Sequence, residues 1–383
     1  MRSLRVLHII DHLGTGGAQQ IIDDIVRHSP DGAYDYTVLY FFDRHRYRAE
    51  LEARGVRVMC FCFGAYTYSR ILFYIFHPYS YLRLIRFLRS EHFDIFHLHL
   101  FYAFIVTLIG VRLQKLWGRS LSARILYTMH AMKNQVPRFF IFLRILGRIP
   151  DVIVGDLPAM VEEMRAVHVP ARRFLVIHTS TDFSDFPVTH PQELRRELGL
   201  SADARILVSV GRLHKQKGYH YFLAAMPKVL EQFPRAVALM VGDGEEMSVL
   251  RHLTRRLRLG ASVRFLGFRA DTARFYDAAD VLVHPATEEA LAIVVLDAMA
   301  RGRAVIACGA GAIASVVRDG ETGYLVERKN SEALADAIIN CLENKFVCDQ
   351  MGERAKRIVE ECYRLDRFVA EYYALYRELV SQK

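Results

Sequence analysis

The apolar residues of this chain gather in short uninterrupted runs that alternate with longer stretches of helical periodicity. The first run, residues 5–10 (RVLHII), leads through a glycine-rich turn into the amphipathic stretch IIDDIVRH. A short run without polar alternation is typical of a parallel strand, because helices cover both faces of a parallel sheet. The same pattern predicts further N-terminal strands at residues 34–42, 57–61, 93–99, 123–130 and 150–156.

The pattern begins again in the C-terminal half, where helical stretches separate another series of apolar runs. Strands are predicted there at residues 204–213, 236–244, 262–268, 280–285, 304–308 and 323–327. Strand and helix in alternation predict an α/β fold with one parallel sheet in each half.

The length of 383 residues suits two domains of ~150–200 residues each. Residues 187–203 are polar and carry two prolines, as linkers between domains often do. We therefore expect an N-terminal domain over residues 1–186, a linker over 187–203 and a C-terminal domain over 204–360. The amphipathic helix at 361–383 is expected to pack back toward the N-terminal domain.

Charge is unevenly distributed along the chain. The formal net charge is +9, and residues 1–186 hold 23 Lys and Arg against 16 Asp and Glu, an excess of 7. A basic half indicates an anionic partner such as phosphate or a membrane surface, while a solvated basic face is the alternative. We expect no nucleic acid, because the sequence has no recognised binding module and no Lys-rich stripe.

The cysteines and the apolar runs bear on the cellular compartment. Six cysteines form no CxxC pair and no zinc-ligand spacing, so free buried thiols in a reducing cytosol are expected. The N-terminal apolar stretch is too short for a signal peptide, and the run 100–111 falls short of the ~20 residues of a spanning helix. We expect a cytoplasmic chain, with peripheral contact to the inner face of the membrane.

The candidate chemistry follows directly after predicted strands, where open parallel sheets bind their ligands. Two such domains facing each other would form a deep cleft between them. The turn GTGGAQ (14–19) offers backbone amides to an anion at a helix N-terminus. A dinucleotide fold would have glycine where Gln19 stands, so a nicotinamide site and a merely tight turn are both alternatives.

A second candidate is GRLHKQKG (211–218), which follows a strand and contains Arg212 and Lys217. A guanidinium and an ammonium at one strand end can hold a diphosphate from two sides. The alternative is a pair of exposed cations in a loop.

Two carboxylates distinguish the stretch HPATEEALAIVVLDAMARG (284–302). Glu289 precedes a predicted helix, and Asp297 lies inside that helix among apolar neighbours. An ionised carboxylate there needs hydrogen-bond donors, from the hydroxyls of a ligand or from a Lys or Arg elsewhere. Acceptors for hydroxyls, cations and a helix N-terminus for phosphate together suit a nucleotide sugar.

These motifs resemble those of the GT-B-fold retaining glycosyltransferases of family 4 (glycosyl transferases group 1) along nearly the whole chain. The stretch EALAIVVLDAMARGRAVIA is similar to the E-x7-E signature, with Glu289 first and Asp297 in the second place. The other similar motifs are GGA (16–18), FHLHL (96–100), YTMH (127–130), VGRLHKQKG (210–218), VGDGEE (241–246) and FLGFRADTARFYDAADVLVHPA (265–286). The resemblance implies two facing Rossmann-like domains with a cleft between them.

The resemblance also implies roles for individual residues. Glu289 would bind hydroxyls of the donor sugar, Asp297 the ribose, and Arg212 and Lys217 the diphosphate. His130 would lie beside the reacting sugar, so that His130, Arg212, Lys217 and Glu289 form the catalytic set. The other positions expected to line the substrate are Gly16, Gly17, His99, Gly211, Gly242, Phe268, Ala290, Leu291, Ala292 and Ile293. The sequence departs from the family where Asp297 replaces the usual Glu and Ala290 the commoner glycine.

The chemistry implied is transfer of a sugar from a UDP- or GDP-type donor with retention of configuration. The leaving phosphate would gain negative charge, which Arg212, Lys217 and a helix N-terminus would stabilise. No D-x-D motif is present, so we expect no metal ion and no cofactor besides the donor. The rival interpretations are an epimerase or hydrolase on the same fold and a non-catalytic nucleotide-sugar-binding protein.

The acceptor is expected to be a saccharide or a lipid-linked saccharide bound by the N-terminal half. Residues 80–90 and 136–150 combine arginines with apolar or aromatic residues, and an aromatic cluster lies at 66–76. Such stretches suit contact with an anionic monolayer, and core-facing helices are the alternative.

Overall fold

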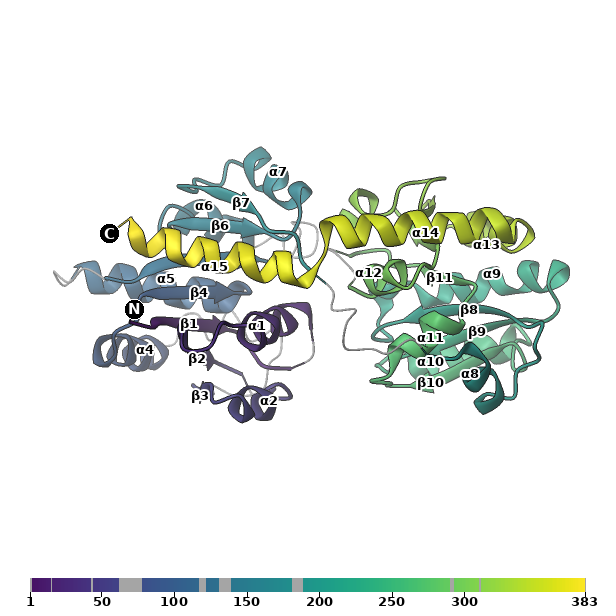
Figure 1. The fold of residues 1–383 in the computed structure, drawn as a ribbon, viewed down its shortest axis with the longest axis horizontal. Helices are drawn as coiled ribbons and strands as arrows, with labels where there is room; N and C mark the ends of the chain where they lie inside the picture. Colours follow the sequence, from purple (N-terminus) through teal and green to yellow (C-terminus); the bar gives the residue numbers. More distant parts are fainter. Residues whose placement is uncertain are drawn as a thin grey trace. The chain divides into compact units, whose positions relative to one another are not determined.

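The computed structural model describes residues 2–14, 16–42, 44–61, 78–116, 122–130, 139–180, 189–289, 293–309 and 311–382. The chain forms two compact units (Figure 1). The first unit comprises residues 1–179 together with 365–383, and the second comprises residues 180–364.

The first unit is built on a seven-stranded sheet in the order β3-β2-β1-β4-β5-β6-β7, in which all neighbouring strands are parallel. Its strands are β1 (Leu4–Ile10), β2 (Tyr34–Tyr40), β3 (Arg57–Cys60), β4 (Ile95–His99), β5 (Arg124–Met129), β6 (Val152–Gly155) and β7 (Phe174–Val176). All strands predicted for this half are present. Strand β7 was not predicted; it has three residues, all half-buried.

Helices cover both faces of this sheet, as the uninterrupted apolar strands require. The helices of the unit are α1 (Gly17–Arg27), α2 (Arg48–Ala53), α4 (Pro78–Ser90), α5 (Phe101–Leu116), α6 (Phe139–Leu146), α7 (Pro158–Ala166) and α15 (Leu365–Ser381). One core joins α4, α5, α6 and α7 to the sheet, and a second core joins α1 and α15 to it.

The helix expected over residues 361–383 corresponds to α15, which follows α14 (Lys345–Cys362) of the second unit. Helix α15 runs along the sheet of the first unit (yellow in Figure 1). Buried Phe368, Tyr372 and Tyr376 attach α15 to that sheet through the core it shares with α1. The N-terminal unit is therefore completed by the last residues of the chain.

The second unit has a six-stranded sheet in the order β10-β9-β8-β11-β12-β13, also with parallel pairings. Its strands are β8 (Arg205–Val210), β9 (Ala236–Val241), β10 (Val263–Gly267), β11 (Val281–His284), β12 (Val305–Cys308) and β13 (Gly323–Val326). Each lies within a run that the hydrophobic pattern predicted.

The remaining elements of the second unit surround this sheet. They are α8 (Pro191–Glu197), α9 (Tyr219–Gln232), α10 (Met247–Arg256), α11 (Thr272–Ala278), α12 (Ile293–Ala300), α13 (Ser331–Glu343), α14, and the 3-10 turns η1 (Lys215–Lys217) and η2 (Gly311–Ser315). Helix α8 falls within residues 187–203, which we expected to be a linker, and it packs against α11. Part of that segment therefore belongs to the folded second unit.

Two further expectations concern the thiols and the membrane. Cys341 and Cys348 form a disulfide between α13 and α14, with Cα atoms 5.3 Å apart, whereas free thiols were expected throughout. Cys60, Cys308 and Cys362 are thiols that take part in no disulfide of the described residues. Across the described part of the chain, none of the helices combines the length and the apolar character needed to cross a bilayer.

Candidate active site

The candidate donor residues lie in loops that leave the carboxyl ends of neighbouring strands in the second unit. Strands β8 and β11 pair directly, and their loops touch where Thr287 N donates to Gln216 O at 2.8 Å. Gly218 makes this approach possible: its φ is +67°, and a Cβ atom there would overlap the carbonyl of Pro285. The loop of residues 211–218 is thus held against the loop before α12.

Lys217 and Glu289 meet at this junction. The Lys217 ammonium contacts Glu289 Oε2, and His284 Nε2 lies 3.5 Å from the same oxygen. Burial opposes ionisation of Glu289, but the charge of Lys217 and the contact with His284 outweigh it and lower the pKa of Glu289 to about 2. Burial also lowers the pKa of His284. The site therefore holds an ionised carboxylate, an acceptor suited to sugar hydroxyls.

Arg212 was grouped with Lys217 and Glu289 in the sequence, but in the structure its ion-pair partner is Glu245. Its guanidinium lies 3.1 Å from Glu245 Oε2, and His214 Nε2 lies 3.3 Å from the other oxygen of Glu245. The Arg212 side chain is 61% exposed, so this ion pair is a solvated one. The structure brings Lys217 and Glu289 together and leaves Arg212 accessible on the same loop.

Two glycines of the predicted site let the ends of β8 and β9 approach closely. Gly211 and Gly242 both have φ of +143°, and a Cβ on Gly242 would overlap the carbonyl of Gly211. Gly242 N donates to Gly267 O at 2.8 Å, which fixes the end of β10 beside them. Phe268 follows directly and is 58% exposed, at the position expected to flank the base.

Asp297 lies in α12 but is half-buried rather than enclosed by its apolar neighbours. Its charge acts on Tyr276, whose pKa is raised well above the ordinary value by burial first and by Asp297 next. The buried Tyr276 hydroxyl has no hydrogen-bond partner among the described residues. Ile293, the first residue of α12, is half-buried, whereas Ala290, Leu291 and Ala292 lie outside the described residues.

In the first unit, Gly16 and Gly17 lie at the start of α1, directly after the turn that follows β1. The Gln19 side chain closes this turn, because its amide donates to His12 O at 2.9 Å and lies 3.2 Å from His12 Nδ1. Gln19 thus fills the place of the third glycine of a dinucleotide fingerprint with a buried, hydrogen-bonded side chain.

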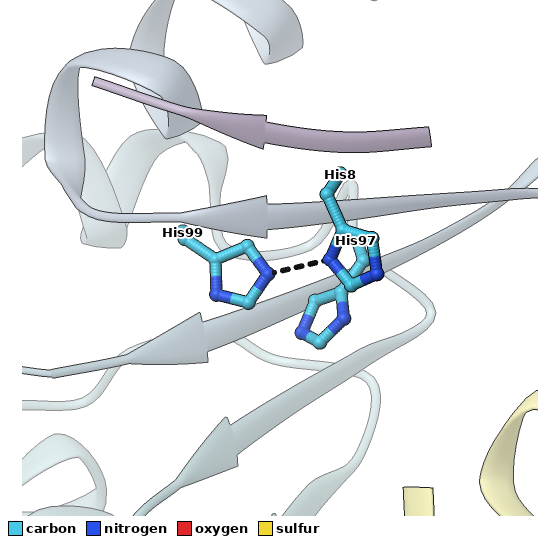
Figure 2. A group of neighbouring side chains, drawn as sticks. All are labelled: His8, His97 and His99. Carbon is cyan, nitrogen blue, oxygen red and sulfur yellow. Dashed lines mark hydrogen bonds between the residues drawn. The ribbon is translucent and has the colours of Figure 1, made fainter. Parts of the chain in front are cut away.

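His99 and His130, the two histidines predicted near the substrate, belong to a larger buried group. His99 Nδ1 lies 3.2 Å from His130 Nε2, and His130 Nδ1 lies 2.9 Å from Asp156 Oδ2. Figure 2 shows the other side of His99, where its Nε2 lies 3.0 Å from His8 Nδ1 and the His97 ring lies close by. Burial lowers the pKa of His8 to about 3 and holds those of His97 and His99 well below the usual value.

Several residues of these groups were not predicted from the sequence. His284 ends β11 and Asp156 follows β6, so both stand at carboxyl ends of strands, which is the signal that could have identified them. Asp11, which follows β1, is fully buried and accepts from the amides of Tyr102 and Ala103 at the start of α5. Burial raises the pKa of Asp11 to about 7 despite these two hydrogen bonds.

The helices expected to face a membrane differ from each other. In α4, Leu84 and Leu88 belong to the core and Ile85 is buried as well, so the core-facing alternative is correct for this helix. In α6, Ile141 and Ile145 are 60% and 58% exposed. The expected aromatic cluster at residues 66–76 and Arg138 lie outside the described residues.

Comparison with known families assigns both halves of the chain. Residues 15–185 match the model of Glycosyltransferase Family 4, and residues 191–358 match that of Glycosyl transferases group 1. Together these matches extend over both parallel-sheet units.

Individual proteins agree with this assignment. N-acetyl-alpha-D-glucosaminyl L-malate synthase of Bacillus anthracis is 26% identical over 76% of this chain and 76% of its own length. D-inositol 3-phosphate glycosyltransferase of Corynebacterium urealyticum is 28% identical over 60% of this chain and 57% of its own length. The fold of Anabaena HepE, solved in complex with UDP and glucose, superposes with a TM-score of 0.81 at 21% identity, covering 96% of this chain and 98% of HepE.

The fold likeness, the two matching family models and the two parallel sheets agree. The chain belongs to the GT-B-fold glycosyltransferases of group 1, family 4.

Proposed function

We propose that this glycosyltransferase moves a sugar from a nucleoside-diphosphate donor, UDP- or GDP-linked, to a saccharide or lipid-linked acceptor with retention of configuration. The observation that carries the proposal is the ionised, nearly buried Glu289, held by Lys217 and His284 at the carboxyl ends of two neighbouring strands. A carboxylate prepared in this way accepts hydrogen bonds from the hydroxyls of a sugar without first losing a proton.

The phosphates of the donor would meet the cations of the same loop. Arg212 is exposed and its ion pair with Glu245 is solvated, so exchanging this partner for a diphosphate costs little. A guanidinium binds phosphate oxygens in a bidentate fashion, while the Lys217 ammonium adds a point charge. Phe268 would lie against the base and Asp297 would accept from the ribose hydroxyls.

Breaking the bond between sugar and diphosphate builds negative charge on the leaving phosphate. Arg212 and Lys217 would stabilise that charge more in the transition state than in the bound donor, which lowers the barrier. In a retaining transfer the leaving phosphate accepts the proton of the acceptor hydroxyl on the same face of the sugar. The side chains required are then cations and hydroxyl acceptors, and we propose a reaction without a metal ion.

UDP is the first donor nucleotide to test. The Anabaena HepE structure contains UDP and glucose, which supports this choice without deciding it for a chain 21% identical to it. The two relatives described above are named for different products, so neither name fixes the sugar or the acceptor.

A lipid-linked acceptor is supported by one surface. Ile141 and Ile145 of α6 are exposed, and Arg144 between them is exposed as well. Two aliphatic side chains next to a cation suit the boundary between acyl chains and anionic headgroups. We propose that α6 brings the protein to the membrane that carries its acceptor.

The test is a thermal-shift screen of the full chain against UDP, GDP, ADP and their glucose, galactose, mannose and N-acetylglucosamine derivatives. A ligand at a hundred times its dissociation constant stabilises the fold by about 2.7 kcal/mol. One base should raise the melting temperature and the other two should not. No shift with any of these compounds would contradict the proposal.

Product analysis with the donor alone separates the rival functions. A transferase is expected to hydrolyse its donor slowly and leave the configuration of the intact donor unchanged. An epimerized donor would identify an epimerase, rapid hydrolysis a hydrolase, and binding without any product a non-catalytic protein.

A further inference from the structure

We propose that Asp156 is a positioning residue whose carboxylate fixes the tautomer and orientation of His130. The same hydrogen-bond direction then continues from His130 through His99 to His8. The inference rests on the proposed function and on the position that the family resemblance implies for His130, beside the reacting sugar.

The chain is assembled by four consecutive strands of the first sheet. His8 lies in β1, His99 ends β4, His130 follows β5 and Asp156 follows β6, and these strands are neighbours in the order β1-β4-β5-β6. The contacts step across the sheet at 3.0 Å, 3.2 Å and 2.9 Å, from His8 to His99, His130 and Asp156. The hydrogen-bond contacts thus link each residue to the next along the chain.

The carboxylate sets the direction of every hydrogen bond. An ionised carboxylate only accepts, so His130 must carry its hydrogen on Nδ1. A neutral imidazole has one N–H, which leaves His130 Nε2 as the acceptor for His99 Nδ1. By the same logic His99 Nε2 accepts from His8 Nδ1.

The far end of the chain agrees with this direction. His8 Nε2 is buried and has no hydrogen-bond partner among the described residues. With all hydrogens pointing toward Asp156, this nitrogen is a bare acceptor. In the reverse arrangement it would be a buried N–H without an acceptor, and such groups are rare in folded proteins.

Burial favours the neutral state of the His8 and His99 rings of this chain. His8 and His99 are fully buried, and desolvation lowers the pKa of His8 to about 3 and that of His99 well below its usual value. The His8 and His99 rings therefore each carry a single hydrogen at neutral pH.

His97 lies beside the chain but belongs to a separate branch. Its Nδ1 lies 2.7 Å from the Tyr376 hydroxyl and its Nε2 lies 2.7 Å from Thr128 Oγ1. His97 therefore serves as an internal reference whose tautomer is independent of Asp156.

A metal ion is the competing interpretation of the same rings, because one nitrogen each of His8, His97 and His99 lies within 4.8 Å of the others. A divalent cation there would have three neutral ligands and would displace His97 from its hydrogen bond with Tyr376 or with Thr128. The hydrogen-bonded chain needs no such displacement, and metal content becomes an outcome of the test.

The experiment is two-bond ¹H–¹⁵N correlation NMR on the full chain with ¹⁵N-labelled histidine. We expect the Nδ1–H tautomer for His8, His99 and His130 in the wild type. An Nε2–H tautomer or a doubly protonated ring at any of the three would overturn the proposal, as would one equivalent of a transition metal by elemental analysis. This measurement decides the matter even if a variant does not fold.

The variant Asp156→Leu removes the acceptor with little change of volume. We expect His130 and His99 to lose the Nδ1–H pattern in it while His97 keeps its own; unchanged spectra would contradict the proposal. Tyr376→Phe is the matched control, since it removes a partner of His97 and should leave the three chain residues as they are.

Kinetics connect the chain to the reaction. With the sugar nucleotide that the wild type uses, Asp156→Asn is expected to lower kcat by roughly ten- to hundred-fold, as the loss of an orienting partner does elsewhere, with KM for the donor nearly unchanged. An unchanged kcat would remove the positioning role. Failure of the wild type to transfer any sugar would instead remove the proposed function and leave the tautomer result standing.

Discussion

The ammonium group of Lys217 contacts the carboxylate of Glu289 across 72 residues of sequence, at the carboxyl ends of the paired strands β8 and β11. The two side chains are 25% and 13% exposed, so neither charge is well solvated and each depends on the other. A donor sugar that takes over part of this contact finds both charges already in place. The pair is therefore the part of the candidate site most sensitive to substitution.

Glu289→Gln should lower sugar transfer by roughly 100- to 1,000-fold, because a preorganised charged acceptor is lost while the shape remains. It should also lower the free energy of unfolding, since the nearly buried Lys217 ammonium is left without its counter-charge. Steady-state rates and urea unfolding measure the two effects. The matched control is Glu288→Gln, the same change one residue earlier, where the half-buried side chain accepts from Gln216. Equal effects at both positions would contradict the assignment.

Arg212→Ala should weaken binding of the nucleoside diphosphate by about tenfold or more, the loss of a charge-assisted contact of ~1.5–3 kcal/mol. Stability should change little, because the Arg212–Glu245 pair is solvated. Isothermal titration with UDP and GDP gives the affinities. Arg318→Ala is the control: it removes a similarly exposed arginine of the same unit from its pair with Glu321. An unchanged affinity for Arg212→Ala would remove the diphosphate role.

Asp297 can be tested through the ribose it is proposed to bind. Asp297→Ala should abolish the preference for UDP over 2′,3′-dideoxy-UDP, or for GDP over its dideoxy analogue, because the acceptor for the ribose hydroxyls is gone. Asp297→Glu, which restores the longer acid of the family signature, should keep that preference or increase it. The control is Asp336→Ala, which removes a 60% exposed carboxylate of the same unit. If Asp297→Ala keeps the wild-type preference, the ribose contact is wrong.

The sequence positions of most strands and the two-domain organisation could be predicted because they depend on residues close together in sequence. Parallel strands buried on both faces produce uninterrupted apolar runs, and these are visible without any partner. Strand β7 could not be found in this way, since it has three residues and none is fully buried. Helix α8 was hidden in a polar, proline-containing segment, where Pro191 begins the helix rather than marking a linker.

The candidate site could be predicted only as far as strand ends determine it. Lys217 and Glu289 follow neighbouring strands, so their contact follows from the topology. The partner of Arg212 depends on the direction of its side chain. The partner of His130 depends on strand register: Met129 is aligned with Gly155, which places His130 next to Asp156. Neither is written in the local sequence. The apolar neighbours of Asp297 in the sequence suggested a buried position, but the residue is only half-buried in α12.

The exposed isoleucines of α6 should account for membrane binding. The double change Ile141→Ser and Ile145→Ser removes most of the apolar area that α6 can insert, so sedimentation with vesicles containing phosphatidylglycerol should fall by about tenfold or more. The fold should be unaffected because both side chains are solvent-exposed. Val249→Ser, at a 54% exposed position of the second unit, is the control. Wild-type protein that does not sediment with these vesicles at low salt would remove the membrane proposal altogether.

The first unit should lose stability steeply as the pH falls below 6.5. Folding lowers the pKa of His8 to about 3, that of His12 to about 4, and those of His97 and His99 well below the usual value, so below pH 6.5 only the unfolded chain binds these protons. Each such group costs about 1.4 kcal/mol of stability per pH unit in that window. Asp11 acts in the opposite direction, since its pKa is raised to about 7 and its protonation between pH 7 and 4 favours the folded state.

The four histidines lower the free energy of unfolding between pH 6.5 and 4, and Asp11 offsets one of them. The net loss therefore corresponds to about three histidines. Urea unfolding at pH 7.5, 6.5 and 5.5, followed by hydrogen exchange of peptides from β1 and β4, measures it. Peptides from β8 and β9 are the reference, because the second unit has His284 as its one fully buried, pKa-lowered histidine among the described residues. His8→Asn removes one titrating ring and should reduce the slope by about 1.4 kcal/mol per pH unit. A slope that does not change with His8→Asn would mean that this ring is already protonated, or accessible to protons, in the folded unit.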